Sequence, residues 1–563
     1  MRIRSRTVTV AALVAAIALA LSACGGGSGG GGGGQVVAPD QQQEGQNDVN
    51  PVPRDQIPDG GDLRWPLDQL PDNLNRLQVD GTLAVNSEVI SSFLPSSHRV
   101  LANATVEVNT DYFTSIELTS TEPQVVTYTL RPEATWDDGT PITWRDLQAQ
   151  WQALNGTNPE FQVSSTTGYE DIASVERGAD DKQAVVTFAQ PFGEWRSLYE
   201  FIYPVSTTTD PTTFNSGWIN AVPTSAGPFR VDNIDTTAQT ITVVRNEKWW
   251  GEPAKLDRII YRVVERGALA DALANNELDF YAIGSDVNLF ARAQGIPGTE
   301  IRQAVQPSYN HVTFGGAPGS LLADPALRRA VAQSIDRQTI ARALIGQIVP
   351  ETTPLGNYLY VQGSKDYVDH SQVVAFDPAA AGAALDGLGW TSPGEGQVRT
   401  NGGRPLTVRF LTDAGNPITE RIIGLVTNQL AAAGIGVEVV QAAAGDFFDE
   451  YITPGNFDMV AFGWQGTAFP ATSTRNIYTS GGEQNYGKIS TPEIDALYDQ
   501  AIRELDDARR VELGQQIDQL LWQEMPQLPL YQSTGAFAVR STLANLGARG
   551  FADVRYADIG FVG

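Results

Sequence analysis

The chain has 563 residues, and its 65 acidic against 38 basic side chains give a formal charge of −27 at pH 7. So acidic a chain argues against a nucleic-acid-binding protein, because phosphate contacts need lysine and arginine. Apolar residues make up 42% of the chain, which is enough for large hydrophobic cores. One cysteine and three histidines exclude a disulfide framework and disfavour multi-cysteine or histidine-rich metal sites, so we expect no metal and no cofactor.

The N-terminal segment predicts export and lipid attachment. Three arginines within the first six residues precede an apolar run over residues 8–21, which is short for a membrane helix and typical of a signal peptide. The single cysteine, Cys24, ends a Leu-Ser-Ala-Cys stretch that resembles the lipobox of bacterial lipoproteins. This resemblance implies a signal peptide over residues 1–23 and a lipid-anchored protein on the extracytoplasmic face of the cell membrane. The alternative is an ordinary secretory signal with an incidental cysteine.

Residues 24–60 predict a flexible tether behind the lipidated cysteine. Residues 25–34 are almost all glycine, and glutamine, asparagine, proline and aspartate follow. Such a segment cannot bury a core and behaves as a coil.

From residue 61 onward, strand-like and helix-like segments alternate, which predicts an α/β body. Expected strands cover 125–130, 184–188 and 240–245, and expected helices begin after the caps Thr143, Asp324 and Thr491. The clearest unit comes later in the chain. A strand over 406–411 leads to a helix that Asn416 caps and Gly434 ends, and strands at 437–440 and 459–462 follow. This βαβ pattern predicts that part of the sheet is parallel.

Short motifs follow one another in a fixed order between residues 128 and 531. The most distinctive are Trp136-Asp137-Asp138-Gly139-Thr140-Pro141, Gly227-Pro228-Phe229, Arg245-Asn246 with Trp249-Trp250-Gly251, Ile335-Asp336-Arg337, and Met525-Pro526-Gln527-Leu528-Pro529. In this order they resemble family 5 of the bacterial extracellular solute-binding proteins, the peptide- and nickel-binding components of ABC importers. Local structure explains most of these motifs without a ligand, so they identify a fold better than they identify what is bound.

The resemblance implies a large two-lobe fold of the periplasmic-binding-protein type (type II, or cluster C), with mixed sheets flanked by helices and a hinge between the lobes. Lobe I is expected over 61–306 with a return segment at 529–563, and lobe II over 307–528. Crossovers are expected near 305–310 and 528–533. The two lobes would close over a small solute, and the closed monomer would deliver it to an ABC permease and its ATPase.

The expected ligand site lies where the strand at 459–462 ends, because open α/β sheets bind ligands beyond the carboxyl ends of their strands. The candidate ligand-binding residues are Trp464, Gln465, Thr467, Phe469, Asn485, Tyr486 and Asp413. In the peptide-binding members of the family that this chain resembles, the corresponding loop carries an aspartate that pairs with the peptide's ammonium group. Residues 463–470 contain no acid, and a buried ammonium without a counter-charge is unfavourable. We therefore predict that free-amine peptides bind poorly, unless Asp413 or Asp446 supplies the charge.

The aromatic candidates leave other ligands open. Trp464, Phe469 and Tyr486 are suited to stacking on sugar rings or to lining an apolar groove, with Gln465 and Thr467 as hydrogen-bonding partners. The alternative for Trp464 is a place in the core of a lobe.

The sequence leaves a glycolipid-related function and an enzymatic function as alternatives. Residues 182–196 resemble a lipoprotein subset of the family in mycolate-bearing actinobacteria, which is tied to the synthesis of phosphatidylinositol mannosides and lipoarabinomannan. That resemblance implies an alternative function, in which a glycan or glycolipid is bound or its synthesis regulated without transport. Catalysis is not expected, since His98, His311 and His370 are widely spaced in ordinary contexts.

Overall fold

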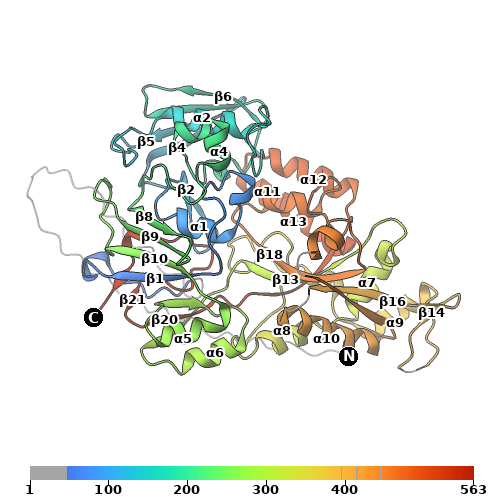
Figure 1. The fold of residues 1–563 in the computed structure, drawn as a ribbon. Coiled ribbons are helices and arrows are strands. Elements are labelled where there is room, and N and C mark those ends of the chain that lie inside the picture. The colour runs from blue at the N-terminus through green and yellow to red at the C-terminus, as the bar shows by residue number, and fades with distance from the viewer. Residues whose placement is uncertain (1–46, 395, 414–415, 444–445) are drawn as a thin grey trace, which may run out of the picture. The chain divides into compact units, whose positions relative to one another are not determined.

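The computed structural model describes residues 47–394, 396–413, 416–443 and 446–563, and these belong to one compact unit. The predicted signal peptide, Cys24 and most of the predicted tether lie outside the described residues. Within the described ranges, no helix is both long and apolar enough to cross a membrane. Helices and strands alternate along the chain, as the sequence predicts (Figure 1).

The first half of the chain builds two four-stranded sheets. One has the order β1 (Asp62–Leu67), β10 (Arg258–Val263), β9 (Thr240–Arg245) and β8 (Phe229–Asp235), with β1 parallel to β10 and the other pairs antiparallel. The other is antiparallel, in the order β4 (Phe113–Thr121), β5 (Gln124–Leu130), β7 (Gln183–Phe188) and β6 (Ile172–Arg177). Helix α2 (Trp144–Leu154) packs on this second sheet, and a capping box between Thr143 and Asp146 begins it.

Smaller elements surround these sheets. They are α1 (Ala84–Ile90), β2 (His98–Val100), β3 (Val106–Val108), α3 (Val205–Thr208), α4 (Pro211–Ser216), α5 (Leu269–Ala274) and α6 (Val287–Gln294). A three-stranded sheet of β11 (Phe280–Ala282), β20 (Ala536–Arg540) and β12 (Thr299–Gln303) follows in the order β11-β20-β12. The last short strands are β21 (Leu543–Ala544) and β22 (Gly560–Phe561), which pair with each other.

The second half of the chain builds a five-stranded mixed sheet. Its order is β17 (Gly436–Ala442), β16 (Thr407–Asp413), β18 (Met459–Gln465), β13 (Ser308–Phe314) and β19 (Gln527–Gln532). Strand β16 is parallel to both β17 and β18, and helix α10 (Pro417–Ala432) connects β16 to β17, which confirms the predicted βαβ unit. Phe410, Val426 and Met459 are buried between this helix and the sheet.

Further helices complete this half. They are α7 (Pro325–Gln333), α8 (Arg337–Ile345), α9 (Pro378–Gly387), α11 (Pro470–Tyr478), α12 (Pro492–Arg503) and α13 (Asp507–Glu524), with a small hairpin of β14 (Thr400–Asn401) and β15 (Arg404–Pro405). The caps predicted at Asp324 and Thr491 begin α7 and α12, and each helix has proline in its first turn.

The chain passes twice between the three-stranded and the five-stranded sheet. Residues 304–307 join β12 to β13, and residues 533–535 join β19 to β20. The two connections lie side by side, since Gln532 Nε2 donates to the Gln306 carbonyl at 2.9 Å and Ala304 N donates to the Gly535 carbonyl at 3.5 Å. The connection at 304–307 overlaps the crossover expected near 305–310, whereas the one expected near 528–533 falls mostly on β19, and the observed connection follows that strand at 533–535. The lobe boundaries themselves stay a prediction.

The start of the described chain differs from the predicted tether. Asp48 N donates to the Ala548 carbonyl at 2.6 Å, Val52 N donates to Asn545 Oδ1 at 2.9 Å, and the Ile57 side chain is only 2% exposed. The polar composition of residues 47–60 favours a coil, but these residues find backbone partners almost 500 positions away, which composition cannot reveal.

The crossover at Gly535 yields a stability prediction. Gly535 has φ +55°, and a Cβ there would lie 1.9 Å from the Ala304 carbonyl oxygen of the other connection. We expect Gly535→Ala to lower the free energy of unfolding by about 2–5 kcal/mol, because it adds overpacking to a left-handed backbone. Gly298→Ala is the control: φ is +69° and no atom lies within 4 Å of its Cβ position, so only a backbone cost of about 1–2 kcal/mol applies. Equal losses in thermal unfolding of the two variants would contradict this account.

Candidate functional site

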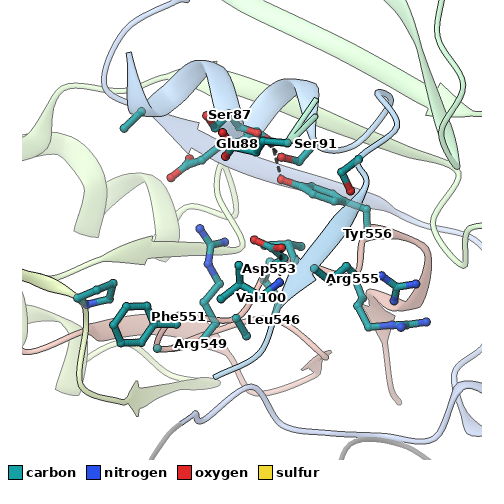
Figure 2. Close-up of a pocket in the computed structure, with 18 of the residues that line it drawn as sticks. Ser87, Glu88, Ser91, Val100, Leu546, Arg549, Phe551, Asp553, Arg555 and Tyr556 are labelled. Atoms are coloured by element: carbon teal, nitrogen blue, oxygen red, sulfur yellow. Dashed lines mark hydrogen bonds between the residues drawn. The ribbon is translucent and has the colours of Figure 1, made fainter. Parts of the chain in front are cut away.

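One large cavity, of about 810 Å³, lies beside the two connections and draws its walls from distant parts of the chain. Ala304, Gln306, Pro307 and Gly535 line its base at the crossovers. One wall combines β1, α1 and β2 with residues 546–558 (Figure 2). Another part of the lining comes from residues 465–469, which begin with the last residue of β18. This volume is in the upper part of the range typical of ligand pockets.

The candidate residues after β18 divide into two groups. Gln465, Thr467 and Phe469 line the cavity. Trp464 lies outside the lining, on the face of β18 that also carries Phe462, and its ring is parallel to those of His311 and Tyr486, at centroid distances of 5.9 and 6.0 Å. This aromatic stack is packed within the second half of the chain.

Asn485 and Asp413 also lie outside the cavity lining. The buried Asn485 side chain donates from Nδ2 to the carbonyls of Thr479 and Ile489, at 2.9 and 3.1 Å, and thereby holds its own loop. Asp413 ends β16 and accepts from Asn416 Nδ2 at 3.3 Å, with its other oxygen buried and without a hydrogen bond. Neither residue contributes a wall of the cavity.

The cavity is rich in charge of both signs. Seven acids line it: Asp68, Glu88, Asp111, Glu200, Glu252, Asp553 and Asp558. Six arginines line it: Arg76, Arg99, Arg196, Arg266, Arg549 and Arg555. None of these is among the site residues predicted from the sequence, because they come from segments hundreds of positions apart and no local pattern marks them.

Three of these acids hold a proton more readily than usual. Asp553 is open to the cavity yet enclosed by protein, and desolvation together with the nearby Glu200 raises its pKa to about 6, against the opposing effect of Arg549 and Arg99. Desolvation also raises the pKa of Glu88 and of Glu200, which Arg549 and Arg76 respectively counteract. A cation brought in by a ligand would stabilise the ionised form of all three.

These acids change the expectation about free-amine peptides. The sequence prediction of poor binding depends on the missing acid in residues 463–470, and that loop indeed presents only Gln465 and Thr467 as polar side chains to the cavity. The opposite wall, however, supplies Glu88, Glu200 and Asp553. A counter-charge for an ammonium group is therefore present in the same cavity, and the reason given for poor binding no longer holds.

A buried carboxylate links the first half of the chain to the loop that lines the cavity. Glu194, fully buried after β7, accepts from the backbone N–H groups of Ala471 and Thr472, at 3.1 and 2.7 Å, at the start of α11. Burial raises its pKa, and these N–H groups oppose that rise. Nearby, Arg503 Nη1 donates to Asp171 Oδ1 at 2.5 Å. Because α11 begins directly after Phe469, this contact fixes one end of the loop at residues 465–469.

The three histidines lie in separate places. His98 follows Ser97, whose Oγ is 2.8 Å from His98 Nδ1, His311 is buried in the aromatic stack, and His370 Nδ1 lies 2.6 Å from Asp518 Oδ2. In the described ranges, no group of three or more histidine, cysteine, aspartate or glutamate side chains is placed to hold a metal ion.

Comparison with known proteins gives a consistent assignment. The family model described as bacterial extracellular solute-binding proteins, family 5 middle, matches residues 107–486. The oligopeptide-binding protein OppA of Mycobacterium tuberculosis H37Rv is 43% identical over 521 residues, which is 92% of this chain and 87% of OppA. The probable monoacyl phosphatidylinositol tetramannoside-binding protein LpqW of the same strain is 33% identical over 312 residues, 54% of this chain and 48% of LpqW.

Solved structures show the same architecture. The periplasmic EDTA-binding protein EppA matches with a TM-score of 0.82 and 25% identity, covering 92% of this chain and 98% of EppA. The oligopeptide-binding protein AppA from Bacillus subtilis, solved with a nonapeptide, matches with a TM-score of 0.73 and 18% identity, covering 90% of this chain and 100% of AppA.

The raised pKa of Asp553 predicts how stability depends on pH. Between the ordinary pKa of an aspartate, near 4, and about 6, the folded protein holds a proton that the unfolded chain has lost, so Asp553 makes stability fall as pH rises. We expect Asp553→Asn to raise the melting temperature relative to the unmodified protein at pH 7, and the gain to shrink as pH falls through 6 to 4. Melting curves across this range measure it, and a gain independent of pH would contradict the assignment.

The Glu194 contact gives a second prediction. Glu194→Gln leaves one oxygen for two N–H groups and places an amide N–H₂ against the other, so we expect a loss of about 1–3 kcal/mol in the free energy of unfolding. Glu493→Gln is the matched control, because Glu493 is a glutamate near a helix N-terminus, in the first turn of α12, but is exposed. Thermal unfolding compares the two, and the contact is unimportant if both variants melt alike.

Proposed function

Because the chain belongs to family 5 of the bacterial extracellular solute-binding proteins, we propose that it captures oligopeptides in the cavity beside the crossovers and delivers them to an ABC importer. Members of this family are solute-binding proteins and not enzymes, and the chain has their α/β periplasmic-binding-protein fold. It therefore acts outside the cytoplasm by binding and release.

The observation that carries the peptide proposal is the charge pattern of the cavity. A peptide with free ends presents an ammonium group, a carboxylate and a row of amides. The lining offers carboxylates in Glu88, Glu200 and Asp553, a guanidinium in Arg549, and hydrogen-bonding groups in Gln465. Electrostatic complementarity of this kind gives orientation and specificity. The resemblance to OppA over most of both chains supports the same ligand class.

Closure supplies the link to transport. The two connections at 304–307 and 533–535 are the place where one part of the chain can rotate against the other, and the cavity lies beside them. A ligand that contacts both residues 465–469 and residues 549–553 favours the closed form, because only closure brings these walls together. The closed form would then be the one that a permease recognises.

We further propose that the chain is held at the membrane through lipid on Cys24. The Leu-Ser-Ala-Cys stretch after the apolar segment supports this. A mass increase that maps to Cys24 in protein from the native membrane would test it, and an unmodified N-terminus after secretion would contradict it.

A role in glycolipid synthesis takes second place. Its support is the likeness of residues 182–196 to a lipoprotein subset of the family. These residues have structural roles, because they include strand β7 and Glu194, which contacts α11, so the likeness needs no bound glycolipid to explain it. The resemblance to LpqW covers about half of each chain, against most of each for OppA.

The decisive measurement is the identity of the bound solute. We expect short peptides to be released when the purified protein is denatured, and mass spectrometry would identify them. We also expect a pool of random pentapeptides to raise the melting temperature of the protein. At a peptide concentration of 100 times Kd the stabilisation should be about 2.7 kcal/mol. Stabilisation by phosphatidylinositol mannosides, with no response to any peptide pool, would instead favour the glycolipid function.

A further inference from the structure

We infer that Arg549 is the anchor for a carboxylate of the bound ligand, an inference that rests on the proposed peptide-binding function. The candidate residues taken from the sequence are on the other wall of the cavity or outside it, and none of them is a cation. The assignment adds a specific anion subsite to the wall formed by residues 546–558.

The backbone that carries Arg549 is held on both sides. Ala552 N donates to the Arg549 carbonyl at 3.0 Å, and Asp553 N donates to the Val100 carbonyl at 3.0 Å. Phe551 packs in a small core with Tyr309 and Val361. Figure 2 shows the Arg549 side chain extending from this turn into the cavity, between Phe551 and Asp553. A guanidinium on such a fixed turn is positioned before the ligand arrives.

The other five arginines of the lining already have protein partners. Arg76 donates to Ser87 Oγ at 3.0 Å, Arg99 lies 3.2 Å from Asp111, Arg196 lies 3.4 Å from Asp507, Arg266 donates to the Ile283 carbonyl at 2.8 Å, and Arg555 donates to Asp558 at 2.8 Å. The Arg549 side chain is half-buried and makes no hydrogen bond or ion pair with any described residue. Its donors are the ones left for a ligand.

The neighbouring carboxylates do not use these donors. Glu88 accepts from Trp65 Nε1 at 3.1 Å, and Asp553 accepts from Val100 N at 2.8 Å. Arg549 acts on both from a distance, since it lowers the pKa of each against the effect of burial. The guanidinium is therefore balanced by surrounding negative charge while its planar fork of N–H groups stays unoccupied.

The surrounding charge also selects the kind of anion. A carboxylate matches the guanidinium fork with two parallel hydrogen bonds. Glu88, Glu200 and Asp553 would repel a dianion such as a phosphate monoester more strongly than a single carboxylate. The same acids would attract an ammonium group carried by the same ligand. The subsite therefore fits the carboxylate of a zwitterion, either a peptide's C-terminus or an acidic side chain.

Three peptide pools test this with the full chain. The first contains random pentapeptides without Asp and Glu as free acids, the second the same peptides as C-terminal amides, and the third amides with one Glu. The concentration that gives half of the maximal rise in melting temperature measures affinity. We expect the unmodified protein to bind the first or the third pool about 10- to 100-fold more tightly than the second, which identifies the source of the carboxylate.

Variants of the protein then show which residue causes the preference for peptides that carry a carboxylate. Arg549→Gln should abolish the preference, so that this variant binds the carboxylate pools no more tightly than the amide pool, and Arg549→Lys should keep part of the preference through its charge. Arg266→Gln is the matched control, because Arg266 lines the cavity but is bonded to the Ile283 carbonyl, so it should keep the full preference. Circular dichroism of each variant checks the fold.

The outcomes separate the inference from the proposed function. If Arg549→Gln and Arg549→Lys both keep the full preference for carboxylates, or if the unmodified protein binds all three pools equally, Arg549 is not the anchor although peptides bind. If no pool stabilises the unmodified protein, the proposed function itself fails.

Discussion

The structure depends on the pairing of two chain segments that cross between sheets. Strands β12 and β20 are neighbours in one sheet, β13 and β19 are neighbours in the other, and the short connections between them are hydrogen-bonded through Gln306, Gln532 and Gly535. Both connections are short and hydrogen-bonded to each other, which holds the two sheets side by side at this point. The cavity lies beside these connections, which contribute Ala304, Gln306, Pro307 and Gly535 to its lining.

Electrostatics sets the character of that site. The chain is strongly acidic as a whole, but the cavity lining is nearly balanced, with seven acids and six arginines. Desolvation raises the pKa of Glu88, Glu200 and Asp553, and a positive charge on a ligand would favour their ionised forms. Binding sites commonly keep such groups at a cost to the stability of the empty protein.

Local structure could be predicted from the sequence because it is encoded within a few residues. The βαβ unit around α10, the cap at Asn416 and the proline that follows need no distant partner, and strand β5 has an alternating pattern of its own. The motif order also identified the family. In the site, Gln465, Thr467 and Phe469 were accessible to this reasoning because they directly follow a strand of the parallel unit.

Contacts between residues far apart in the chain could not be predicted from the sequence. Glu88, Glu200 and Asp553 meet only in three dimensions, and nothing in their neighbourhoods distinguishes them from surface acids. Trp464 illustrates the same limit, since its place in the sequence fits a ligand platform and a packed stack equally, and its ring contacts with His311 and Tyr486 appear only in the structure.

The docking of Asp48 has a practical consequence for how the protein is produced. Asp48 bonds through its backbone to Ala548 and through its carboxylate to Gln303 N, at 3.0 Å, so it joins strand β12 to the turn that holds Arg549. A recombinant form trimmed at residue 60, where composition suggests the ordered part begins, would lose these contacts with Gln303 and with the segment that carries Arg549. Expression designs that retain residues 47–60 keep these contacts.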